Sequence, residues 1–222
     1  MNIVVFILLM IICIGSVYIV HKYFGKSEFY LLAVIYSIMS FLMSFKMINI
    51  FGININCSII FESGILTILY YFINRYSANE VKKYFITIVV STVVCELFLI
   101  TTSFIVPSIY DKMSTFYEDL ITTSTAIFVF YPISLIISLV LSGYAFKEIK
   151  SIKENKLVKM IIILIGIMFI DTLLFIYFSY AFIIRFDTSL IITLDNYIIR
   201  VLVMVTFILI TSRLLRVKKV KE

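Results

Sequence analysis

Six charged side chains interrupt stretches of this 222-residue chain that are otherwise apolar: Lys46, Glu62, Glu96, Asp171, Asp195 and Arg200. A charge placed in hydrocarbon costs at least about 2.5 kcal/mol, so each of them needs a partner, water or a function. Acids and bases in such positions can line a route for a polar solute, and one of the acids can carry a proton. We therefore predict that all six are substrate-binding residues.

Arg200 is permanently charged, so it requires a partner inside the protein. Asp195, at i−5 on the same predicted helix, is poorly placed for that role, whereas Asn196, at i−4, shares the face of Arg200. Asp171 lies at a similar predicted depth and is the better partner. The sequence leaves open whether such a pair is purely structural or also lines a substrate or proton route.

The remaining charges differ in their predicted depth. Glu96 lies close to the predicted midplane and is a candidate proton-coupling acid. Lys46 and Glu62 lie near the outer ends of their segments, where they would line the entrance. Each of these two could instead reach the lipid headgroups, or they could pair with each other.

The elements that carry these residues are seven apolar segments: 2–20, 29–48, 57–74, 84–106, 121–146, 160–184 and 190–212. Each approaches or exceeds the ~20 residues that span the hydrocarbon of a bilayer as a helix. A chain that is 63% hydrophobic, with a mean hydropathy of +1.14, has too few polar residues for a soluble fold. We predict one all-α membrane domain, residues 1–222, with a peripheral first helix at 2–20, a six-helix transport core at 29–212 and a basic cytoplasmic tail at 213–222.

Lysine and arginine are concentrated on alternate connections between the segments. Of 19 such residues, 15 follow the first, third, fifth and seventh segments. The positive-inside rule then places the N-terminus outside and the C-terminus in the cytoplasm, as in a multi-pass protein of the bacterial cytoplasmic membrane. The same cations account for the net charge of +6, so the expected partner is the lipid bilayer and not nucleic acid.

Enzyme and metal-site signatures are missing from the sequence. The three cysteines, Cys13, Cys57 and Cys95, are isolated, and His21 is the single histidine. No HExxH, GxSxG or P-loop motif occurs. We expect no catalytic residues, no metal ligands and no cofactor.

Two features of the fifth segment concern helix shape and packing. Pro132 lacks a backbone N–H and predicts a kink. Ser134, Ser138 and Ser142 recur every four residues, which favours close packing against another helix over the lining of a cavity. Residues 107–120 are expected to form the longest outer loop, and 147–159 to extend the neighbouring helices.

Short motifs occur along nearly the whole chain: Tyr23-Phe24-Gly25-Lys26 followed by Tyr30, Lys46 with Phe51-Gly52, Tyr76 with Glu80–Lys83, Pro132 with Ser138, Asp171-Thr172 with Phe175, and Asp195 with Tyr197 and Arg200. Together they resemble the queuosine-precursor transporter family, also called the vitamin uptake transporter (VUT) family, in its Gram-positive branch with an extra first helix. The resemblance implies a six-helix core that imports deazapurine precursors of queuosine.

The chain departs from the pattern of that family at several polar positions. Tyr70 and Asn74 stand where the family usually has Asp and Glu, and Ile133 stands where an Arg is expected. A polar Arg-Asn-Asn stretch before the sixth helix is not found around 159–164. These departures leave open a different substrate or a paralogue that no longer transports.

We predict a membrane transporter that imports a small heterocyclic solute, a queuosine precursor (7-deazapurine) or a vitamin-like compound. One alternative is a substrate-binding membrane subunit that needs an energising partner. A second is a non-transporting membrane paralogue, for example a sensor or assembly factor. Association into a homo-oligomer is compatible with each of these.

Overall fold

The computed structural model describes residues 2–105, 114–151, 156–181, 184 and 186–214. Six stretches in these ranges are long and apolar enough to cross a membrane. The protein is therefore a multi-pass, all-helical membrane bundle, as the sequence predicts. Its helices are α1 (Asn2–Tyr23), α2 (Lys26–Ser44), α3 (Ser58–Arg75), α4 (Ala78–Ser103), α5 (Ser114–Ser151), α6 (Lys156–Thr172), α7 (Phe178–Ala181) and α8 (Phe186–Leu214).

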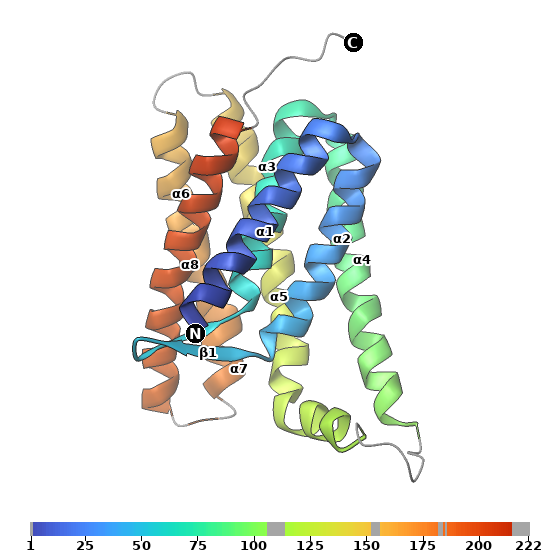
Figure 1. Ribbon diagram of the computed structural model, residues 1–222, viewed down its shortest axis with the longest axis vertical. Helices are drawn as coiled ribbons and strands as arrows, with labels where there is room; N and C mark the ends of the chain where they lie inside the picture. Colours follow the sequence, from blue (N-terminus) through green and yellow to red (C-terminus); the bar gives the residue numbers. More distant parts are fainter. Residues whose placement is uncertain (1, 106–113, 152–155, 182–183, 185, 215–222) are drawn as a thin grey trace.

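The long helices run alternately in opposite directions, so that the start of α1 and the end of α8 lie at opposite ends of the bundle (Figure 1). The turns between α1 and α2 and between α3 and α4 lie at the end where α8 finishes. The helix ends beside these turns carry Lys22, Lys26, Arg75, Lys82 and Lys83. We call this the basic end. The opposite end, where α1 begins, is the outer end in the predicted orientation. Most of the predicted basic tail, 213–222, lies outside the described residues.

Helix α3 forms the centre of the bundle. Fifteen of its 18 residues are buried, including residues on every side of the helix. Its 18 residues give a length of about 27 Å, close to the hydrocarbon thickness of a bilayer. It is absent from the six stretches with spanning character because Glu62, Asn74, Arg75 and several hydroxyl side chains lower its hydropathy.

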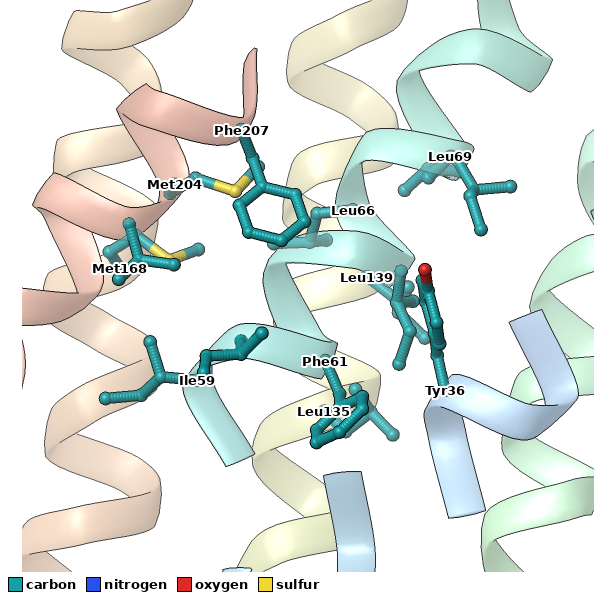
Figure 2. Packing of buried hydrophobic residues seen from close by; sticks show 14 of the residues in the cluster. Tyr36, Ile59, Phe61, Leu66, Leu69, Leu135, Leu139, Met168, Met204 and Phe207 are labelled. Atoms are coloured by element: carbon teal, nitrogen blue, oxygen red, sulfur yellow. The ribbon is translucent and has the colours of Figure 1, made fainter. Parts of the chain in front are cut away.

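Apolar side chains from α2, α5, α6 and α8 close around α3 (Figure 2). On one side Met204 and Phe207 of α8 face Leu66, and on another Tyr36 of α2 lies near Leu69. All of these side chains are at most 4% exposed. These side chains gain dispersion contacts with their close-packed neighbours, and lipid tails would replace such contacts only in part.

A β-hairpin replaces the predicted end of the second segment. The sequence predicts a helix over 29–48, but α2 ends at Ser44, and β1 (Met47–Ile50) pairs with β2 (Ile53–Asn56) in antiparallel register. Ile and Asn alternate along both strands, as expected for a strand and not for a helix. The two-residue turn Phe51-Gly52 has φ of 53° and 85°, which is the type I′ geometry preferred in hairpins.

Helices α5 and α6 both depart from regular geometry. The first part of α5 lies across the outer end of the bundle (Figure 1), and its backbone leaves helical geometry at Ser124, with φ −119° and ψ 19°. The expected loop 107–120 is therefore helical from Ser114 on, whereas 106–113 lie outside the described residues. α5 continues as helix through Pro132. After Thr172, α6 passes into a π-helical turn, η1 (Leu173–Tyr177), which leads directly into α7.

Candidate functional site

Three charged side chains meet in the middle of the bundle. The guanidinium of Arg200 on α8 binds Glu62 of α3 through Nη2 and Asp171 of α6 through Nη1. Arg200 is 1% exposed, Asp171 4% and Glu62 9%. Two carboxylates on one guanidinium leave one formal negative charge in the group. We call Glu62, Asp171 and Arg200 the central triad.

Hydroxyl groups from two further helices support the carboxylates. Ser134 Oγ on α5 donates to Asp171 Oδ1 at 2.6 Å. Ser40 Oγ on α2 lies 3.4 Å from Glu62 Oε1. The predicted pair of Asp171 and Arg200 is confirmed, and Glu62 joins it. The sequence suggested Lys46 or the headgroups as partners of Glu62, and the structure contradicts that suggestion.

The reason is the position of the hairpin at the outer end of the bundle. β2 ends at Asn56, which is fully buried, just before α3, so that Glu62, 9% exposed, lies beneath a layer of protein. Lys46 was expected inside the second span. It lies instead in the exposed connection between α2 and β1, where its backbone N–H donates to Met43 O at 3.0 Å. Lys46 is exposed there, and among the described residues it makes no ion pair with Glu62 or Asp171.

Several polar atoms around the central triad have no hydrogen-bond partner in the described part of the chain. They are Arg200 Nε, Tyr131 Oη and Ser138 Oγ. Tyr131, Ser134 and Ser138 line the same small cavity as the triad, which holds only about 10 Å³. A space of this size takes at most one water molecule. The site is therefore closed, and more of its polar atoms lack partners than is usual for buried groups.

Asp171 sits directly before the irregular part of its helix. Thr172 Oγ1 donates to Met168 O at 2.6 Å, and the π-helical turn η1 starts at the next residue. π-helical turns occur often at functional sites, because the extra residue in the turn changes which side chains face the interior. Here the turn buries Phe175 and Ile176, and the ring of Phe175 packs at 5.2 Å from that of Tyr131.

Glu96 of α4 lies apart from the central triad. It is 8% exposed, and its Oε1 has no hydrogen-bond partner in the described part of the chain. Among the described residues no lysine or arginine lies within ion-pair distance of it. The structure thus contains two kinds of buried acid. Glu62 and Asp171 share Arg200, whereas Glu96 has no counter-charge among the described residues.

Asp195 contacts the hairpin and not the triad. Its Oδ2 accepts a hydrogen bond from the backbone of Asn54 at 3.2 Å. The neighbouring Asn196, which is fully buried, accepts from Asn56 N at 2.7 Å and donates to Asn54 O at 3.0 Å. The amide of Asn196 thus binds β2 as a residue of an adjacent strand would, which satisfies backbone groups that water cannot reach. We call this the Asn196 contact.

The Asn196 contact closes the outer end of the site. Asn196 lies one turn before Arg200 on α8, and Asn56 lies just before α3, which carries Glu62. Asn56 also donates through Nδ2 to Ser44 O at 2.7 Å, which ties α2 to the same point. The hairpin therefore joins α2, α3 and α8 between the central triad and the outer surface.

Comparisons with protein-family models, with curated proteins and with solved structures gave no match to this chain. The resemblance to the queuosine-precursor transporter family thus stays a prediction that rests on the motifs quoted above. Of the six predicted site residues, the structure brings together Glu62, Asp171 and Arg200, and leaves Lys46, Glu96 and Asp195 elsewhere.

Sequence reasoning missed three polar side chains of this site, Ser40, Tyr131 and Ser134. Ser134 belongs to the serine stripe that was predicted to serve close packing, and all three serines of that stripe are buried. The signal that could have found it is the shared spacing of the stripe with Tyr131, which places Tyr131, Ser134 and Ser138 on one face of α5.

Proposed function

We propose that this protein is a membrane transporter that imports a small, flat heterocyclic solute, of the 7-deazapurine kind that its resemblance to the queuosine-precursor transporter family implies. The observation that carries the proposal is the central triad with its unpartnered neighbours Arg200 Nε, Tyr131 Oη and Ser138 Oγ. A purely structural ion pair needs no such neighbours. A polar solute passing through the bundle would satisfy them.

The chemistry of the triad suits a heterocycle with N–H donors and a carbonyl acceptor. The carboxylates of Glu62 and Asp171 can accept hydrogen bonds from ring and amino N–H groups, and Arg200 can donate to a carbonyl oxygen. Tyr131 adds an aromatic face, held between Phe41 at 5.6 Å and Phe175 at 5.2 Å. Base-like rings bind well between such planar groups.

Transport requires the closed site to open. Since the cavity holds about 10 Å³, a heterocycle enters only when the helices around it separate. Glu62 and Arg200 lie on α3 and α8, whereas Asp171 and Ser134 lie on α6 and α5. Opening between these two pairs of helices would exchange the Arg200–Asp171 contact for a contact with the solute, and release of the Asn196 contact would admit the solute from outside.

The proposal is tested by uptake of radiolabelled 7-deazaguanine precursors into cells that lack their own carriers and express this chain, with guanine and riboflavin in parallel. We expect accumulation of the deazapurine by the natural chain. Asp171→Asn should abolish it, because the variant loses a carboxylate that binds both Arg200 and the solute.

The matched control is Asp187→Asn, which removes an exposed carboxyl from the first turn of α8, at the outer end. It should transport at the natural rate. Equal amounts of each variant in the membrane fraction are required for the comparison. If the natural chain accumulates none of the three solutes although it is well inserted, autonomous transport of this solute class is rejected.

A further inference from the structure

A recess of about 610 Å³ opens between α4 and α5 at the basic end of the bundle. Lys82 of α4 and Lys147 of α5, both exposed, line it together with the aromatic side chains of Tyr76 and Tyr144. Its remaining wall is apolar and includes Phe85, Ile86 and Val140. We call it the α4–α5 groove. It is separate from the central triad, and none of its lining residues belongs to that site.

The two lysines of the groove differ from their neighbours at the basic end. Lys26 and Lys83 both pair with Glu80, at 3.0 and 3.1 Å. Lys82 and Lys147 have no carboxylate within ion-pair distance in the described ranges. The α4–α5 groove therefore has two uncompensated positive charges beside an apolar wall.

The shape of the groove depends on Gly143. A Cβ at this position would lie 2.7 Å from the ring of Phe85, which is closer than real Cβ contacts allow. The missing side chain lets the ring of Phe85 lie against α5, where it forms the floor of the groove. The groove is thus built by a close approach of two helices and is more than a gap between lipid-facing side chains.

We propose that the α4–α5 groove binds a phospholipid with an anionic headgroup. Lys82 and Lys147 would hold the phosphate, and one acyl chain would lie along Phe85, Ile86 and Val140. Basic pockets between spanning helices on the cytoplasmic side suit such headgroups, and the side chains of Tyr76 and Tyr144 suit the headgroup level. The proposal does not depend on what the central triad transports.

The test uses the full chain, purified in detergent, with dioleoyl phosphatidylglycerol as the anionic probe and dioleoyl phosphatidylcholine as its neutral match. Native mass spectrometry counts the lipids retained, and the unfolding temperature is followed with a thiol-reactive dye at the buried Cys13 and Cys57. We expect the natural chain to retain phosphatidylglycerol and to be stabilised by it. Lys82→Gln/Lys147→Gln should bind it about 10-fold more weakly or worse.

Two controls separate a built site from general surface charge. Lys22→Gln/Lys159→Gln removes the same charge from exposed positions at the same end, outside the groove, and should bind as the natural chain does. Val140→Trp fills the groove without changing a charge and should also weaken binding. Folding of each variant is checked by its unfolding temperature without added lipid.

Four results would overturn the proposal. Equal weakening in both double lysine variants would mean that only the overall charge matters. Equal retention of the two lipids would remove the role of the headgroup, and equal binding of soluble glycerol phosphate would remove that of the acyl chain. A change in self-association that is specific to Lys82→Gln/Lys147→Gln would assign the groove to a second copy of the chain instead.

Discussion

Helices α3 and α4 follow each other in the chain, and both are predicted to cross the membrane. The less apolar of the two, α3, is the more deeply buried. α4 is one of the six stretches that are long and apolar enough to cross a membrane, and α3 is not. α3 is buried over nearly its whole length. α4 is more apolar, stands at the edge of the bundle (Figure 1) and exposes a row of large apolar side chains. They are Ile86, Val90, Val93, Val94, Leu97 and Phe98.

The same relation holds for the other spanning helices. α1 is the most apolar of the six and is among the least buried, whereas α2 and α8 are the least apolar and the most buried. In a bilayer, lipid is as apolar as a protein core, so polar side chains are the ones that gain from facing protein. Hydropathy in this chain therefore follows exposure at the surface of the bundle, and its low values mark the buried helices.

The largest loss of stability is expected when α3 loses the buried partner of its Glu62, which is Arg200 of α8. Arg200→Met leaves Glu62 and Asp171 buried without their shared cation, which should lower the free energy of unfolding by about 3–5 kcal/mol. The measurement is thermal or denaturant unfolding in detergent, followed by dye labelling of Cys13 and Cys57. A Cys95→Ser background removes the half-buried third thiol.

The control for this prediction neutralises the whole triad, as Glu62→Gln/Asp171→Asn/Arg200→Met. It should recover most of the lost stability, because no unpaired charge stays buried. If the single and the triple variants are equally unstable, the effect comes from lost packing of the long Arg200 side chain and not from charge.

A smaller effect should follow from the close packing of α3. A Cβ on Gly64 would lie 2.5 Å from the ring of Tyr36, whose hydroxyl is fixed by a 2.7 Å hydrogen bond to Cys13 O. Gly64→Ala should therefore cost about 1–3 kcal/mol. Gly166→Ala on α6 has no atom within 4 Å of its Cβ and should gain up to about 1 kcal/mol from helix propensity. Shifts of the same sign would contradict this account.

The sequence predicts the helical bundle, the alternating direction of its helices and the Arg200–Asp171 pair, because these depend on hydropathy, on the positions of the cations and on depth. It places Glu62 wrongly at the entrance, since depth was counted without the hairpin that covers the outer end of α3. The hairpin itself could have been found from the alternation of Ile and Asn around Phe51-Gly52. Because Met47 and Ile48 of β1 are apolar, they were assigned to the end of the second predicted segment, 29–48.

The contact of Asn196 with β2 could not be predicted, because it joins residues about 140 positions apart. Nothing local to Asn196 distinguishes a side chain that binds a strand from one that lines a cavity. The same limit applies to Ser134, whose partner Asp171 lies 37 residues along the chain. Polar residues within spans can be recognised from sequence, but their partners require the fold.

The contact of α8 with the hairpin gives an intermediate effect. Asn196→Ala removes both hydrogen bonds from buried backbone groups of β2 and should cost about 1–3 kcal/mol. Asp195→Ala removes one 3.2 Å hydrogen bond from a half-buried position and should cost less than about 1 kcal/mol. Hydrogen exchange at 53–56 checks the cause, since only Asn196→Ala should greatly speed exchange there. Equal exchange in both variants would contradict the assigned role of Asn196.

The smallest effect on stability is expected for the buried acid of α4. Glu62→Gln should cost about 1.5–3 kcal/mol, because it weakens a charged hydrogen bond to Arg200. Glu96→Gln is the same change at an acid with no partner at Oε1, and it should alter the free energy of unfolding by less than about 0.5 kcal/mol. Both are measured by dye labelling, as for Arg200→Met.

Uptake then separates the two roles that remain for Glu96. If it carries the coupling proton, Glu96→Gln folds normally but no longer accumulates solute against a gradient, and its residual uptake loses the pH dependence of the natural chain. If Glu96 only fills its buried position on α4, both stability and uptake stay unchanged. A large loss of stability in Glu96→Gln would show that α4 holds a buried contact as important as those of α3, and the contrast between the two helices would then fail.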